Sequence, residues 1–208
     1  MRRSLLIIGA SIIPIICHAQ EAHLSVSPFW GYRFGGEVID TPAKIRVADH
    51  STYGLRIDYD ISPTLAAELE GSRNDSHLTD SRYTPSQFEF RQDSYLVLGK
   101  ITFPGLPIAP YVALGGGLSR IDTLFALSEG THDYFTGTFA AGLEWFFCAH
   151  VGARLDGRLY ATDIHGDPIG ATCTAFEPNS NGAVVPVECA RKNWLLSEEA
   201  SLGLVLRF

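Results

Sequence analysis

Hydrophobic and polar residues alternate with a period of two along most of the chain. From Leu24 to Phe34 the even-numbered positions are apolar or aromatic, whereas the odd-numbered positions include Ser25, Ser27 and Arg33. Alternation of this kind predicts strands whose two faces meet different environments. The pattern recurs in the segments 24–34, 53–61, 65–70, 95–103, 111–120, 135–145, 151–161 and 194–208. The sequence therefore predicts an all-β protein with eight strands.

The charged residues lie on one face of these predicted strands, among small and polar residues. The opposite face stays apolar for about ten residues, which is the length of a tilted strand that crosses a bilayer. Many apolar runs also begin or end in an aromatic residue, as at Tyr53, Phe103, Trp145, Trp194 and Phe208. Aromatic residues gather at the two interfaces of a membrane, so this pattern favours a transmembrane barrel over a water-soluble sandwich.

The connections between the predicted strands alternate in length. Three of them are short, such as the turn at 62–64. The longer polar connections lie near 35–51, 74–88, 122–133 and 163–192. We therefore predict an eight-stranded antiparallel transmembrane up-and-down β-barrel with short periplasmic turns and long extracellular loops. A further hairpin around Val184–Val187 would give ten strands, and this alternative remains open.

The N-terminus has the features of a secretory signal peptide. A basic start at Arg2 and Arg3 precedes a short apolar run, and Ala19 precedes the expected cleavage site. The apolar run is too short for a membrane-spanning helix, which needs about 20 residues. We assign residues 1–19 to the signal peptide and residues 20–208 to the barrel domain, which we expect in the bacterial outer membrane.

Two cysteines flank the central part of the fourth long segment. Cys173 and Cys189 enclose a stretch that is rich in Pro, Asn and Gly. Secreted proteins form disulfides in oxidising compartments, so we predict a disulfide between these two cysteines. The role of Cys148 stays open.

Two short motifs occur in the fifth predicted strand and at the end of the chain. Residues 109–118 read Ala-Pro-Tyr-Val-Ala-Leu-Gly-Gly-Gly-Leu, and residues 203–208 read Gly-Leu-Val-Leu-Arg-Phe. The first is similar to the Pro-Tyr-(small or apolar)-Gly-x-Gly strand of the small outer-membrane β-barrels, which include the OmpA-like transmembrane domain, the opacity-type proteins and the Ail/OmpX-like barrels. The second resembles the C-terminal signal that the barrel assembly machinery reads. The resemblance implies the same fold, outer-membrane lipid as a partner, and an assembly signal at Leu202, Leu204, Leu206 and Phe208.

The charged face of each strand points into the barrel in this prediction. The predicted lumen ion network comprises Arg33, Arg56, Asp58, Asp60, Glu68, Glu70, Lys100, Glu144, Arg154, Asp156, Arg158, Glu199 and Arg207. An eight-stranded barrel is barely wide enough for its own side chains, and an isolated buried charge costs several kcal/mol. We therefore expect these charges to pair and fill the barrel. The competing interpretation is a narrow polar conduit for water or small ions.

The turn at 62–64 fixes which charges face each other on the second and third predicted strands. It sets Arg56 opposite Glu70 and Asp58 opposite Glu68. The second pair is like-charged and needs a cation from elsewhere. The candidates are Lys100, Arg56 and Arg154.

Three functional hypotheses follow. The leading one is a non-enzymatic barrel that contributes to envelope integrity and presents surface loops for adhesion or binding, with 163–192 as the loop for an extracellular ligand. A disulfide that merely protects this loop from proteases is the competing interpretation. The second hypothesis is a narrow passive pore, and the third is a lipid A-modifying enzyme, of the kind that carries a His-x-Ser motif on a lipid-exposed strand.

The sequence offers little for other kinds of chemistry. The net charge is −7 and there is no basic tract, so we do not expect nucleic acid as a partner. Pairs such as His132-Asp133 are too loosely spaced to predict a site. We therefore expect no catalytic residues, no cofactor and no metal.

Overall fold

The structure, a computed structural model, describes residues 23–36, 38–39, 45–80, 87–105, 108–125, 128–164, 174–178, 184–188 and 193–208. Its strands are β1 (Leu24–Phe34), β2 (Val38–Ile39), β3 (Ile45–Val47), β4 (His50–Asp60), β5 (Leu65–Asp80), β6 (Gln87–Thr102), β7 (Ile108–Phe125), β8 (Ser128–Cys148), β9 (Val151–Ile164), β10 (Thr174–Pro178), β11 (Val184–Glu188) and β12 (Asn193–Arg207). The predicted signal peptide at 1–19 and the predicted disulfide between Cys173 and Cys189 lie outside the described residues. None of the described residues form a helix long and apolar enough to cross a membrane.

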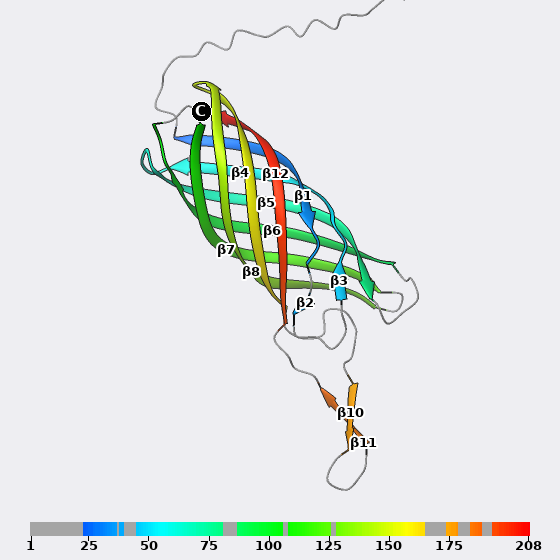
Figure 1. The fold of residues 1–208 in the computed structure, drawn as a ribbon. Coiled ribbons are helices and arrows are strands. Elements are labelled where there is room, and N and C mark those ends of the chain that lie inside the picture. The colour runs from blue at the N-terminus through cyan, green and yellow to red at the C-terminus, as the bar shows by residue number, and fades with distance from the viewer. Residues whose placement is uncertain are drawn as a thin grey trace, which may run out of the picture.

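Eight of these strands form a closed antiparallel barrel (Figure 1). Their order around the ring is β1-β4-β5-β6-β7-β8-β9-β12, and β12 pairs with β1 to close it. Following the paired residues once around the ring from Leu24 returns to Phe34, ten residues further along β1. This stagger tilts the strands and leaves an interior that side chains can fill. The predicted fold class is confirmed.

The barrel has its apolar and charged residues in the reverse arrangement to a water-soluble protein. Leu114 and Tyr95 on the outside expose 67% and 60% of their surface, whereas Arg56 and Arg154 on the inside expose 0%. An apolar outer surface is stable against lipid, and a closed ring leaves no unpaired strand edge within the bilayer. The chain is therefore a bacterial outer-membrane protein, as the alternation predicts.

Short turns and the C-terminus occupy one end of the barrel (Figure 1). In the β4–β5 turn the backbone N–H of Leu65 donates to the Ser62 hydroxyl at 3.0 Å, which holds the turn closed. In the β6–β7 turn Gly105 has a φ of 111°, a conformation that favours glycine. The N–H of Phe208 donates to the Leu24 carbonyl at 2.8 Å, so the first and last strands meet at this end. Outer-membrane barrels place their short turns in the periplasm.

The strands at the extracellular end run further than the sequence predicts. β5 and β6 stay paired up to Thr79, and β7 and β8 stay paired up to Phe125. The predicted loops near 74–88 and 122–133 are therefore wrong over most of their length. Polar composition does not separate a loop from a strand pair outside the membrane, because an antiparallel ladder can continue with water on both faces.

Shorter strands also lie at this extracellular end. β2 pairs with β12 and β3 pairs with β5, so two parts of the first long connection extend the barrel sheet. Within the described residues, β10 and β11 pair with each other in a separate two-stranded sheet (Figure 1). The hairpin that the sequence allowed around Val184–Val187 is thus present, but it does not enter the barrel. The ten-strand alternative is wrong.

Candidate functional site

The β4–β5 turn positions the first charged layer of the lumen. Arg56 lies opposite Glu70 and Asp58 lies opposite Glu68, in the register that the turn predicts. Arg56 Nε donates to Glu70 Oε2 at 3.0 Å. Asp58 and Glu68 are fully buried neighbours of like charge, so they need cations from other strands.

Two cations on other strands reach this acidic pair, one of them from the far side of the barrel. Arg154 on β9 places Nη1 3.2 Å from Asp58 Oδ2, and its Nη2 donates to Glu68 Oε2. Lys100 on β6 places Nζ 3.2 Å from Asp58 Oδ1 and 2.8 Å from Glu144 Oε1. Both are among the candidates that the sequence suggested. The like-charged register is therefore neutralised by strands that are remote in sequence.

Arg56, the third candidate, neutralises other carboxylates. Besides Glu70 it bonds Asp156 on β9, and its Nη2 lies 3.4 Å from Glu199 Oε1 on β12. Arg33 on β1 also binds Glu199, with Nη2 2.8 Å from Oε2. Arg56 thus connects β4 to three other strands at the centre of the lumen.

Arg158 completes the set by bridging two glutamates on β5. Its Nη2 lies 2.7 Å from Glu68 Oε1, and its Nη1 contacts Glu70. We use the name lumen network for the buried members Arg33, Arg56, Lys100, Arg154, Arg158, Asp58, Glu68, Glu70, Glu144, Asp156 and Glu199. Five cations therefore face six carboxylates in one connected set.

Two residues of the predicted network stay apart from it. Asp60 is half-buried at the periplasmic end of β4. Arg207 is half-buried at the end of β12, where its guanidinium stacks at 4.1 Å on the Phe146 ring. Strand alternation places both on the inward face, but both lie at the rim rather than in the filled centre.

Three inward aromatic side chains support the network, and the sequence analysis assigns them no role. The Arg56 guanidinium lies 3.6 Å from the centre of the Phe29 ring. Arg154 Nε donates to the Tyr111 hydroxyl at 2.7 Å, and the Tyr160 hydroxyl donates to a network carboxylate at 2.9 Å. The available signal was their position, because each occupies the polar face of its strand, where an aromatic residue is out of place.

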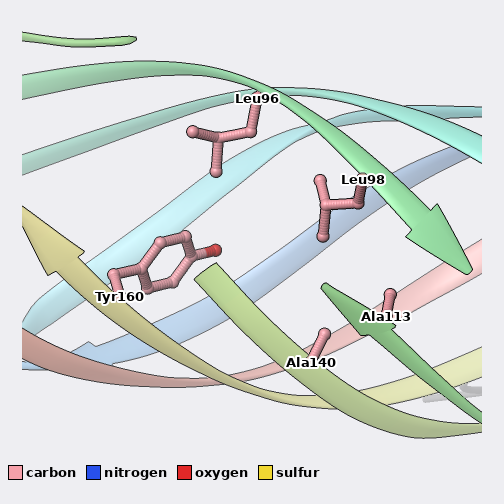
Figure 2. Close-up of a cluster of buried hydrophobic side chains, with 5 residues drawn as sticks. All are labelled: Leu96, Leu98, Ala113, Ala140 and Tyr160. Carbon is pink, nitrogen blue, oxygen red and sulfur yellow. The ribbon is translucent and has the colours of Figure 1, made fainter. Parts of the chain in front are cut away.

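An apolar wall lines another side of the lumen. Figure 2 shows its members Leu96, Leu98, Ala113, Ala140 and Tyr160, which come from β6, β7, β8 and β9. Alanine at two inward positions leaves space that the long arginine side chains can occupy. The charges are thus enclosed by apolar groups rather than by water, which strengthens their mutual attraction.

Side chains also fill the lumen on the extracellular side of the network. Ser94 and Ser119 lie 2.9 Å apart, and Thr136 bonds both Ser119 at 2.8 Å and Thr162 at 2.9 Å. Beyond these hydroxyl groups the buried inward residues include the apolar Ile121, Tyr134, Ile164 and Leu195 and the polar Asn74, Ser76 and Gln92. The interior thus passes from charges through hydroxyl groups to a layer of mixed apolar and polar side chains.

The residues considered for catalysis lie apart from one another. No three His, Cys, Asp or Glu side chains within the described ranges are placed to hold a metal ion. A His-x-Ser triplet occurs at His23-Leu24-Ser25. Ser25 is buried inside the barrel and donates to Asp58 Oδ2 at 3.3 Å, so its hydroxyl does not face lipid. His132 and Asp133 are exposed near the extracellular end of β8.

The residues of the predicted assembly signal lie on the outer face at the end of the chain. Leu202, Leu204 and Phe208 are exposed there, and Leu206 is partly exposed. Cys148 is half-buried at the end of β8, next to the short turn into β9. Placement alone assigns neither group a function.

Comparison with known proteins gives a fold and no closer identity. No protein-family model and no curated protein sequence matches the chain. Among solved structures, Neisserial surface protein A matches at 13% identity and a TM-score of 0.62, covering 90% of this chain and 98% of its own. The outer-membrane protein OprG from Pseudomonas aeruginosa matches at 11% identity and a TM-score of 0.57, covering 90% and 96%. These likenesses place the fold among the small outer-membrane barrels.

Proposed function

We propose that this small outer-membrane barrel is a closed, non-enzymatic scaffold that supports envelope integrity and holds extracellular hairpins for binding. The observation that carries the proposal is the burial at the centre of the lumen network. Arg56, Asp58, Glu68 and Arg154 each expose 0% of their surface. A water molecule needs free space and polar partners of its own, and such complete burial leaves no water-sized space beside these residues. This supports a filled barrel rather than a narrow pore.

The connectivity of the lumen network supports a mechanical role. Its ion pairs link strands across the ring, such as β5 with β9 through Glu68 and Arg154, and β4 with β9 through Arg56 and Asp156. Flattening the barrel would separate these partners and leave buried charges unpaired, which costs several kcal/mol. The network therefore favours one cross-section of the barrel.

The extracellular end supports the binding part of the proposal. The paired extensions of β5–β8 form a rigid base, and the separate β10–β11 hairpin belongs to the 163–192 segment. Loops on rigid scaffolds commonly carry binding functions. An extracellular ligand of this segment remains part of the proposal.

Planar-bilayer recording of the purified, refolded barrel tests the closed state. We expect no unitary conductance across the applied voltages, while a porin recorded in the same membranes conducts. Steady single-channel events from the barrel would contradict the proposal and favour the pore.

A deletion strain tests the role in the envelope. We expect greater sensitivity to detergent without the gene, and rescue both by the full chain and by a chain lacking 165–192. If the shortened chain also keeps every surface-binding phenotype, the binding part of the proposal is wrong.

A further inference from the structure

A second set of charges lies on the outer surface of the barrel, apart from the lumen. The outer charge lattice consists of Arg73, Asp75, Arg91, Asp93, Arg120, Asp122 and Asp133. Six of these residues come from an Arg-x-Asp triplet that occurs once in each of β5, β6 and β7, and Asp133 lies on β8. Because neighbouring strands are antiparallel, the register sets each arginine opposite an aspartate, and opposite charges alternate along each strand as well.

The aspartates hold the arginine side chains in fixed positions. Arg73 donates to Asp93 through Nε at 2.6 Å and Nη2 at 2.8 Å, Arg120 Nε donates to Asp133 at 2.9 Å, and Arg91 makes a similar contact at 2.8 Å. These hydrogen bonds raise the pKa of all three arginines. The arginine side chains nevertheless expose 44%, 53% and 54% of their surface. A carboxylate fork uses two of the five N–H donors of a guanidinium, so donors remain for a further acceptor.

The lattice begins directly beyond the aromatic edge of the apolar surface. Asp93 lies two residues before Tyr95 on the same face of β6, and Asp133 lies two residues before Phe135 on the same face of β8. In both strands the aspartate is therefore the next outward residue towards the extracellular end. Tyr95 and Phe135 are exposed, and both pair with Leu118 between them. Outward aromatic residues mark the membrane interface, so the next outward residues lie at the level of the lipid headgroups.

We propose that the outer charge lattice docks the phosphorylated headgroups of outer-leaflet glycolipids through Arg73, Arg91 and Arg120. Arg73 and Arg120 lie two strands apart, a spacing of about 10 Å, and Arg91 lies two residues further along the strand between them. Arginine forks match phosphate oxygens, and side chains that are already ordered lose little entropy on binding. This proposal concerns the outer surface and stands whether or not the lumen conducts.

The charge balance of the lattice gives the proposal a distinctive consequence. Its three arginines face four aspartates, so a phosphate is attracted by local guanidinium donors and repelled by the neighbouring carboxylates. Removing an arginine should therefore weaken docking, whereas removing an aspartate should leave it unchanged or strengthen it. If the lattice only stiffened the strands, removing either partner would break the same ion pair, and both kinds of variant would change the docking equally.

The test measures binding of diphosphoryl lipid A to the full barrel in detergent with EDTA, so that bridging cations do not contribute. The variant carrying R73Q, R91Q and R120Q should bind at least about tenfold more weakly than the unmodified barrel. Lipid A without its phosphates should bind both barrels equally weakly. Heat-modifiable mobility on a denaturing gel checks that each variant is folded.

The matched control carries D75N, D93N and D133N, which break the same three ion pairs and keep the arginines. Equal weakening by the arginine and aspartate variants would overturn the proposal, and so would affinity that does not depend on the phosphates. Binding of a soluble anionic polysaccharide without any effect on lipid A would also overturn it. Should the triple variant fail to fold, R120K and R120Q replace it, and the lysine variant should keep more of the binding because it keeps the charge.

Discussion

At the scale of single residues, the buried arginines decide how the interior is built. Each has a fixed charge, because the guanidinium does not lose its proton in proteins. The Arg154 guanidinium is neutralised by Asp58, 3.2 Å from Nη1, and by Asp156, 3.0 Å from Nε. Its Nε also donates to the Tyr111 hydroxyl at 2.7 Å. Removing one partner of a buried pair is costly because the other charge then stays buried and unpaired.

Replacing Arg154 with Gln should therefore destabilise the barrel strongly. We expect the free energy of unfolding to fall by about 3–5 kcal/mol, measured by urea unfolding in lipid vesicles. The control is Arg207→Gln, since Arg207 is also inward but half-buried at the rim, and it should cost less than about 1 kcal/mol. A similar loss of unfolding free energy in both variants would contradict the view that burial makes the lumen network important for stability.

A pH titration tests one ion pair of the outer charge lattice, beyond the apolar membrane-spanning surface. The hydrogen bond from Arg120 lowers the pKa of Asp133 below its ordinary value. The stabilisation is thus present above the unfolded pKa, near 3.9, and is lost as the pH falls through the lower pKa of the folded state. The carboxyl carbon of Asp133, followed by NMR, should titrate below this value, and Arg120→Gln should move its midpoint back up. An unchanged midpoint would show that the pair does not form in solution.

At the scale of the strand, the close approach of the β7 backbone to β6 restricts which residues β7 can contain. A Cβ atom on Gly115 would lie 2.0 Å from the Val97 carbonyl oxygen and 2.6 Å from Leu98 Cα. Only glycine avoids this clash, which gives a physical reason for the glycine-rich run in the strand. Gly137, on the outer face of β8, has no neighbour within 4 Å of an added Cβ.

These two glycines give a matched pair of substitutions. Gly115→Ala should cost about 1–3 kcal/mol, because the backbone of β6 or β7 has to shift. Gly137→Ala should be neutral or slightly stabilising, since alanine restricts the unfolded chain. Urea unfolding monitored by tryptophan fluorescence compares the free energies of unfolding of the two variants. Equal changes in both would contradict the close approach of the backbones at Gly115.

At the scale of the whole molecule, the barrel and the 163–192 segment are separable units. β9 and β12 pair directly from Ile164 and Asn193 to the periplasmic end, so the ring closes without the intervening residues. Replacing 165–192 with two glycines should keep the heat-modifiable mobility of a folded barrel. Loss of that mobility would show that the segment is required for the fold.

The sequence by itself determined the orientation of each strand and the first charged layer. Strand alternation is local, so Ser25 and Arg33 could be assigned to the inside of β1 without any knowledge of their neighbours. The β4–β5 turn is local as well, and it fixes the opposition of Arg56 and Glu70.

Only the tertiary structure decided which charges that are remote in sequence meet in the lumen, and where the strands end. Arg33 and Glu199 are 166 residues apart in the chain, and they meet because the ring closes with a stagger of ten residues from Leu24 to Phe34. Closure depends on all eight strands at once, so no local pattern contains it. The outer charge lattice was hidden for a similar reason, since its Arg-x-Asp triplets lie partly in segments whose polar composition resembles loops.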